Sequence, residues 1–147
     1  MTSTPAPADH LATFRRWVLA ILVFAFVGTA LELVFLEHYD GWRQWVPLLL
    51  LAEGAVVGTI LLVRPVPSLI SHWRLLMVVF VVAGGVGMWF HYAGNLEFEL
   101  ERTPDLAGLP LVHSTLEGAT PVLAPGTLIQ FGLLGLLFAW RHPLRRT

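Results

Sequence analysis

The sequence predicts an all-α integral membrane protein, an up-and-down bundle of four transmembrane helices with an extended acidic outer loop between the third and the fourth. Composition is the first reason, because 56% of the 147 residues are hydrophobic and 13% are charged. Soluble domains are about 45–50% apolar and about 25% charged. The second reason is that four apolar stretches approach the roughly 20 residues with which a helix crosses a bilayer.

The predicted spans share a low content of charged residues and cover about residues 17–36, 45–63, 75–94 and 122–140. They must be helical in lipid, because isolated strands would leave backbone polar groups without hydrogen bonds. Together they form one membrane domain over residues 14–147. The preceding residues 1–13 are rich in Pro, Thr and Ala, which predicts a flexible cytoplasmic tail.

The arginines orient the predicted bundle. If the spans alternate in direction, seven of the nine arginines fall on one side, namely Arg15, Arg16, Arg64, Arg74, Arg141, Arg145 and Arg146. The cytoplasmic side of a membrane protein carries the excess of Lys and Arg. The pattern therefore predicts that both termini lie in the cytoplasm and that the spans cross a bacterial-type inner (plasma) membrane.

Cysteine and lysine are both absent from the sequence. Without cysteine the chain cannot form a thiolate metal site, an iron–sulfur cluster or a covalently attached c-type haem. Without lysine it cannot form a Schiff base with retinal or pyridoxal phosphate. The net charge of −1 gives no support for a nucleic-acid partner.

The second outer segment, residues 95–121, is long and carries an acidic pattern. Within it, the sequence LEFELE at residues 96–101 alternates apolar with acidic side chains. This period of two predicts an extended strand with one apolar face. The segment is then expected to cap the bundle with an acidic rim that attracts cations, formed by Glu97, Glu99, Glu101 and Glu117.

Polar side chains interrupt all four spans, at Glu32, Glu53, His91 and Gln130. An ionisable group in hydrocarbon costs about 2.5–3.5 kcal/mol at mid-span, so each needs a stabilising partner. With the predicted boundaries all four lie in the outer half of the bilayer, and Glu53 is deepest at about 12 Å. Small residues on the faces of Glu32 and His91 indicate that both point into the bundle. The sequence therefore predicts an outward-facing polar pocket.

Two interpretations of this pocket compete. In the structural one, the four side chains hydrogen-bond one another and hold the bundle together. In the functional one, Glu32, Glu53 and His91 are ligands or relay groups for a cation or a proton, with Gln130 beside them. The shared depth of the four side chains favours the functional interpretation.

A divalent metal is one version of the functional interpretation. Its candidate ligands are His38, His91 and His113 on the outer side, although their spacing matches no specific metal motif. A haem held by His38 and His91 is less favoured, because both residues lie near the water boundary.

The predicted function is therefore non-enzymatic binding or passage of a cation or proton by a small polytopic protein. An enzyme is not favoured, because no nucleophile candidate lies at the depth of the intramembrane Glu and His residues. The alternative is a non-catalytic accessory subunit of a larger membrane complex, including one that carries a cofactor or pigment. The GxxxG motif of Gly54 and Gly58 suits close packing against such a partner or a second copy of the chain.

Overall fold

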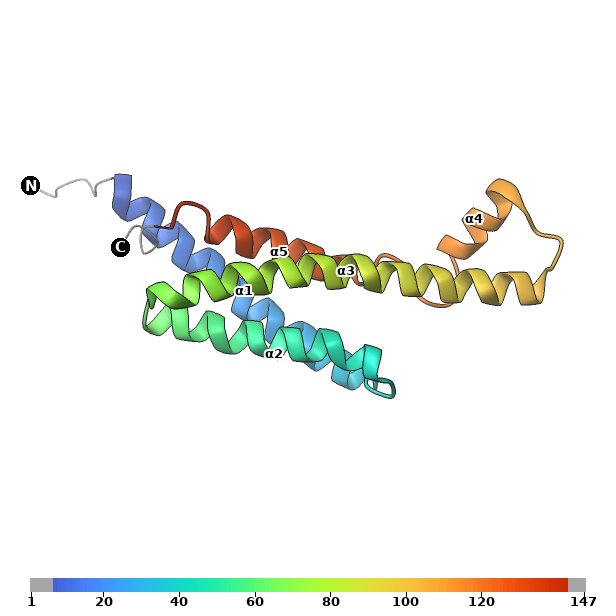
Figure 1. Cartoon of the computed structure of the whole chain (residues 1–147), viewed down its shortest axis with the longest axis horizontal. Helices are drawn as coiled ribbons and strands as arrows, with labels where there is room; N and C mark the ends of the chain where they lie inside the picture. Colours follow the sequence, from blue (N-terminus) through green and yellow to red (C-terminus); the bar gives the residue numbers. More distant parts are fainter. Residues whose placement is uncertain (1–6, 143–147) are drawn as a thin grey trace, which may run out of the picture.

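Every secondary-structure element that the structure describes is a helix. The computed structural model describes residues 7–142, and their helices are α1 (Pro7–Phe35), α2 (Trp42–Val63), α3 (Pro67–Arg102), α4 (Gly108–Leu116) and α5 (Gly126–Phe138). The predicted all-α class is thus confirmed for this part of the chain. Figure 1 shows that α1, α2, α3 and α5 form a bundle, while the far end of α3 projects beyond it and carries α4.

Three helices are long and apolar enough to cross a membrane: His10–Phe35 within α1, then α2 and α3. The remaining apolar helix, α5, has 13 residues and is about 20 Å long, less than the roughly 30 Å of hydrocarbon in a bilayer. A turn over residues 122–125 precedes it. An all-helical chain with three candidate membrane spans is therefore confirmed for the described residues, and the fourth crossing stays a prediction.

Two helices extend further toward the N-terminus than the sequence pattern indicates, and one of them, α3, has a proline at its start. α1 begins at Pro7, so residues 7–13 are helical although their composition predicts a tail; residues 1–6 lie outside the described part. α3 begins at Pro67 rather than near residue 75. Proline suits the first helical position, because no N–H is needed there and its fixed φ matches the helix. α3 thereby gains about two turns.

The strand predicted for residues 96–101 is wrong, because α3 continues as a helix to Arg102. Leu and Glu are strong helix formers, and extending an existing helix costs less than nucleating a new element. Helical spacing also buries Asn95 and Glu99, which lie one turn apart. Part of the expected extended loop is α4, which packs against the projecting end of α3.

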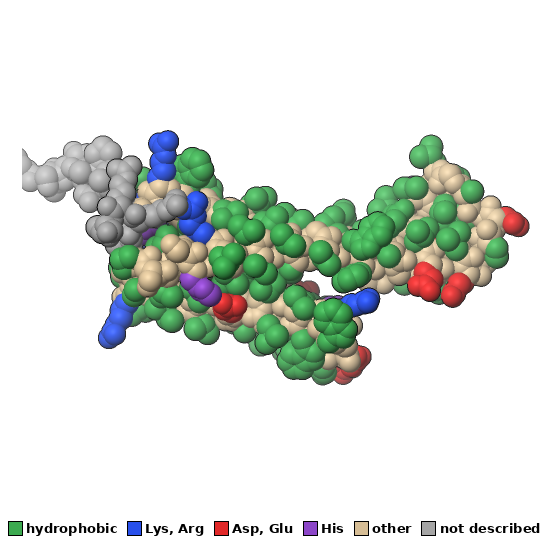
Figure 2. Space-filling view, viewed as in Figure 1, with side chains coloured by type: hydrophobic (Ala, Val, Ile, Leu, Met, Phe, Trp, Pro, Cys, Tyr) green, Lys and Arg blue, Asp and Glu red, His purple; other side chains and the backbone are tan. Residues whose placement is uncertain are grey.

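The bundle consists of two closely packed pairs, α1 with α2 and α3 with α5. α1 starts and α5 ends at the same end of the bundle (Figure 1), where Arg15 Nη2 donates a hydrogen bond of 2.8 Å to the carbonyl oxygen of Trp140. Arginine side chains gather at this end, whereas most acidic side chains in view lie toward the opposite end (Figure 2). We call the two ends the arginine end and the acidic end.

Aromatic side chains join the two helix pairs. The ring centroid of Phe26 from α1 lies 6.1 Å from that of Trp73 and 5.2 Å from that of Phe80, both on α3. It also lies 5.3 Å from the ring centroid of Phe131 on α5. The buried indole N–H of Trp73 donates a hydrogen bond of 2.9 Å to the carbonyl oxygen of Gly135. This bond satisfies the only polar group of a side chain that has no access to water.

The GxxxG motif packs α2 against α1 of the same chain. An added Cβ at Gly54 would lie 2.9 Å from the ring of Phe26, and one at Gly58 would lie 2.6 Å from the side chain of Val23. Both glycines therefore serve an approach of two helices within one chain. They give no support to the expectation that this motif contacts a partner.

Replacing Gly132 with alanine tests the close approach of α3 and α5. An added Cβ there would lie 2.6 Å from the carbonyl oxygen of Met77, a backbone atom that cannot swing away. We expect Gly132→Ala to lower the free energy of unfolding by about 1–3 kcal/mol relative to Gly85→Ala, the range typical of overpacking. Gly85 on α3 is the matched control, because nothing lies within 4 Å of its added Cβ. Unfolding in mild detergent measures the difference, and equal stabilities would contradict this packing.

Candidate functional site

An acid–base pair joins two spans, Glu53 of α2 and His72 of α3. The carboxylate Oε1 lies 2.8 Å from the imidazole Nε2. The side chains are 45% exposed for Glu53 and 47% exposed for His72, so the pair lies on the outer surface of the bundle rather than in its core. The surrounding helices are apolar, and in a membrane this surface faces lipid or a neighbouring protein.

His72 is a site residue that the sequence pattern misses. A third span that starts near residue 75 leaves His72 in a connecting loop. Because α3 begins at Pro67, His72 lies in its second turn, about 7.5 Å along the helix axis. Glu53 lies about 15 Å along α2 from Val63. Proline as a marker of a helix start is the sequence signal that could have placed His72 on the span.

Glu32 of α1 and Gln130 of α5 are exposed, and no hydrogen bond or ion pair involves either side chain in the described part of the chain. The face of α1 beside Glu32 is open, since nothing lies within 4 Å of an added Cβ at Gly28, one turn away. No hydrogen bond or ion pair of the described residues connects these two with Glu53 or His91. A pocket shared by all four residues therefore stays a prediction.

Two histidines interact at the acidic end of the bundle. His91 of α3 donates from Nδ1 to the carbonyl oxygen of Pro121 at 2.9 Å, since a carbonyl can only accept. His38 lies in the connection between α1 and α2 and is half-buried. Burial, and then the positive charge of His91, lower the pKa of His38. The two imidazoles are therefore close enough to influence each other electrostatically.

The candidate metal ligands His38, His91 and His113 do not form one cluster. His113 lies on α4, where its Nδ1 is 3.2 Å from Oε2 of Glu117. Among residues 7–142, no group of three or more His, Asp or Glu side chains is arranged to hold a metal ion. The metal prediction therefore lacks a ligand cluster in this part of the chain, and these contacts do not test a haem between His38 and His91.

The four glutamates of the predicted acidic rim have different environments. Glu99 is 4% exposed, and its Oε2 accepts a hydrogen bond of 2.7 Å from Nη2 of Arg102. Glu117 is exposed at the C-cap of α4. Glu97 and Glu101 are exposed one turn apart, and they share a face of the projecting part of α3.

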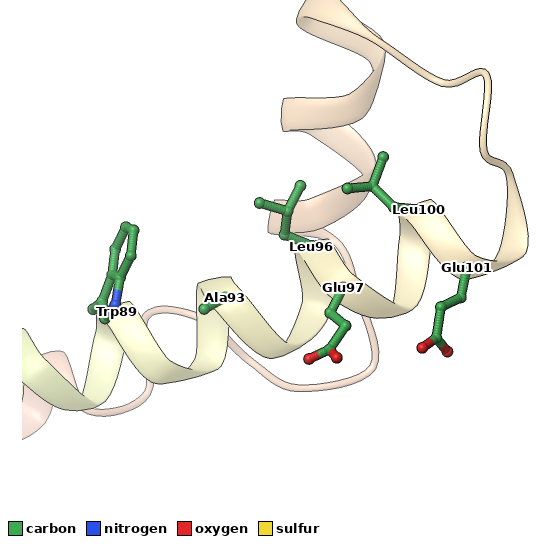
Figure 3. Close-up of a pocket in the computed structure, with 6 residues that line it drawn as sticks. All are labelled: Trp89, Ala93, Leu96, Glu97, Leu100 and Glu101. Atoms are coloured by element: carbon green, nitrogen blue, oxygen red, sulfur yellow. The ribbon is translucent and has the colours of Figure 1, made fainter.

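A shallow groove runs along the projecting part of α3. It has a volume of about 470 Å³ and is lined by Trp89, Ala93, Leu96, Glu97, Leu100 and Glu101. Figure 3 shows Leu96 and Leu100 pointing to one side of the helix and the two glutamates to the other. Because all six residues belong to α3, the groove is a strip of helix surface rather than an enclosed binding cavity.

Asn95 fastens the segment around α4 to α3. Its Nδ2 donates to the carbonyl oxygens of Thr115 at 3.0 Å and Thr120 at 2.7 Å, and its Oδ1 accepts from the N–H of Thr120 at 3.1 Å. Asn95 is buried, and an added Cβ at Gly118 would lie 2.6 Å from its side chain. No local sequence pattern indicates this role of Asn95, because its partners lie on a distant segment.

Comparisons with protein-family models, with curated proteins and with solved structures found no match to this chain. Its function is therefore inferred from the placement and chemistry of its own side chains. Among the ion pairs of residues 7–142, the Glu53–His72 pair is the one that joins two different spans.

The lowered pKa of His38 predicts that acid destabilises the fold. An imidazole whose pKa is lowered by folding binds fewer protons in the folded chain than in the unfolded chain. Its contribution to the stability of the fold is therefore fully present above the ordinary pKa of 6.5 and is lost as the pH falls below that value. The pKa of His142 is also lowered, by burial and then by the charge of Arg15, which adds a change of the same sign. We expect the unfolding midpoint in detergent to fall between about pH 7.5 and about pH 5.5.

The variant His38→Gln should show a smaller fall over the same pH range, because it removes one of the groups that bind extra protons on unfolding. His142→Gln should reduce the fall further when the two changes are combined. A midpoint that rises on acidification, or a fall that His38→Gln leaves unchanged, would contradict this origin of the pH dependence.

Proposed function

We propose that this chain is a small multi-pass membrane protein that holds a proton at the Glu53–His72 pair, and that it binds or passes protons or cations there. The observation that carries the proposal is the 2.8 Å contact between a carboxylate and an imidazole on two neighbouring helices, each long and apolar enough to cross a membrane. Titratable groups within spans are costly and are commonly retained for ion or proton handling.

The pair has the chemistry of a proton-holding site. With one proton between them, carboxylate and imidazole carry no net charge, whichever group holds the proton. An apolar environment favours this state, because a lone charged side chain costs about 2.5–3.5 kcal/mol at mid-span. Loss of the proton leaves one negative charge, which favours an arriving cation, and gain of a second leaves one positive charge.

The proposed orientation places the arginine end in the cytoplasm of a bacterial-type inner membrane, with both termini there. Arg15 and Arg16 flank the start of the apolar part of α1, and Arg64 and Arg74 lie near the α2–α3 connection. The positive-inside rule supports this orientation. The return of α5 to the same end supports a fourth crossing, in which local thinning of the bilayer makes up for its short length.

Glu53→Gln tests the proposed function. Glutamine keeps the size of the side chain and a hydrogen-bond acceptor for His72 but has no titratable proton, so the free energy of unfolding should change by less than about 1 kcal/mol. We expect the infrared spectrum of the variant to lose the carboxyl band that belongs to Glu53, while the band of Glu32 remains. Proton flux through liposomes that contain the variant should fall to the level of empty liposomes.

Glu37→Gln is the matched control, because Glu37 is exposed in the connection between α1 and α2. It should leave both the carboxyl signal and the flux as in the wild type. Unchanged titration and flux in a stable Glu53→Gln variant would contradict the proton-holding role. Destabilisation of Glu53→Gln with unchanged titration would instead assign the pair a structural role.

A second candidate function is that of an accessory subunit, and the exposure of Glu32 and Gln130 favours it. Neither side chain has a hydrogen-bond partner in the described part of the chain. A polar group that faces lipid is costly, whereas a neighbouring protein helix can satisfy it. The open surface at Gly28 beside Glu32 would let such a helix approach closely.

Glu32→Leu distinguishes this candidate. If Glu32 contacts a partner helix, the substitution should dissociate a complex purified in gentle detergent while the chain itself stays folded, because no side-chain hydrogen bond or ion pair within the described chain is lost. Glu37→Leu removes the same charge outside the spans and should leave the complex intact. Size-exclusion chromatography with mass measurement reports the assembly, and a complex unaffected by Glu32→Leu would contradict this role of Glu32.

A further inference from the structure

A crevice opens at the arginine end of the bundle, where α1, α2 and α5 meet. Its volume is about 440 Å³, and its lining includes Arg15, Arg16 and Leu19 of α1, Leu61 and Leu62 of α2, and Phe138 of α5. The crevice is lined by segments of three helices that lie more than 40 residues apart in sequence, so it exists only in the assembled bundle. It is also separate from the Glu53–His72 pair, neither member of which lines it.

The inner wall of the crevice is apolar. Leu19, Leu61 and Phe138 are buried, at 1%, 6% and 5% exposure, and Leu62 is half-buried beside them. A surface of this kind accepts hydrocarbon in place of water.

The lip of the crevice is cationic. Arg15 is half-buried and uses Nη2 to bind the carbonyl oxygen of Trp140, which holds its guanidinium at the mouth. Arg16 is exposed next to it, and no hydrogen bond to the described residues occupies its guanidinium. The charge of Arg15 also reaches the end of α5, where it contributes to the lowered pKa of His142. The positive field therefore extends across the mouth.

Two tryptophans place this mouth at the level of lipid headgroups. Trp17 and Trp140 are exposed, at 67% and 62%. Trp17 follows Arg16 in sequence, and the carbonyl oxygen of Trp140 accepts the hydrogen bond from Arg15. Tryptophan is enriched where the hydrocarbon meets the headgroups, because its ring is apolar and its N–H is polar. A ligand in the crevice would thus have its charged part among headgroups and its apolar part in the bilayer.

We propose that this crevice binds an anionic phospholipid, whose phosphate contacts the guanidinium groups of Arg16 and Arg15 and whose acyl chain lies against Leu62 and Phe138. Guanidinium groups bind phosphate oxygens with charge-assisted, often bidentate hydrogen bonds. Basic residues at the cytoplasmic ends of spans attract anionic lipid in the same way. A free phosphate ion would use the lip alone, so the apolar wall favours the lipid.

The full chain in neutral detergent, mixed with phosphatidylglycerol or phosphatidylcholine, provides the test. Native mass spectrometry counts the lipid molecules that stay bound, and we expect selective retention of phosphatidylglycerol by the wild type. Arg16→Gln should weaken this retention about fivefold, which corresponds to about 1 kcal/mol for one basic residue near an anionic surface. Arg16→Lys keeps the charge and should recover most of the retention.

Arg74→Gln is the matched control, because Arg74 lies on α3 and does not line the crevice. It should retain phosphatidylglycerol as the wild type does. Equal losses in Arg16→Gln and Arg74→Gln, or equal retention of the two lipids by the wild type, would overturn the proposal. Inorganic phosphate at the same concentration should not displace the lipid; displacement would identify a site for free phosphate and overturn the lipid assignment.

Discussion

The close seam between α3 and α5 is the constraint on which the rest of the bundle depends. At Gly132 and Gly135 α5 carries no side chain, so its backbone lies against Met77 and Trp73 of α3. Lipid tails are as apolar as these helices, so the hydrophobic effect cannot drive their association. Dispersion contacts and the buried hydrogen bond from Trp73 to Gly135 hold the two helices together instead. The rings around Phe26 then extend the same packing to α1.

The tightly packed interior of the bundle explains why Glu32 and Glu53 lie on its outer surface. Among the described residues, no buried side-chain polar atom lacks a hydrogen-bond partner. Asn95 and Glu99 have hydrogen-bond partners within the chain, and the core between the helices is formed by buried apolar and aromatic side chains. Glu32 and Glu53 are consequently on outer faces, where lipid, protons or a neighbouring protein can reach them. A function that uses them must act at the surface of the bundle.

Composition and span length are sufficient to predict the helical class, because backbone hydrogen bonding in lipid leaves few alternatives. The alternation at residues 96–101 predicts a strand wrongly, because Leu and Glu also suit a helix. The role of Asn95 could not be predicted from local periodicity, because Asn95 bonds to a residue 20 positions away in sequence. The Glu53–His72 pair could not be predicted from the sequence for another reason. Its formation depends on the rotation and offset of two packed helices, which spacing within one span does not determine.

The position of His72 follows from that of its neighbour. Consecutive residues on a helix point about 100° apart, so a side chain next to one that faces the core is turned toward a flank. Trp73 is fully buried and held by Gly135, and Ile70 is buried on the same face. The seam thereby fixes the rotation of α3, and this rotation presents His72 to Glu53 of α2. A rotation of α3 that separated the pair would also withdraw Trp73 from Gly135, so the packing that buries Trp73 is the same packing that brings His72 to Glu53.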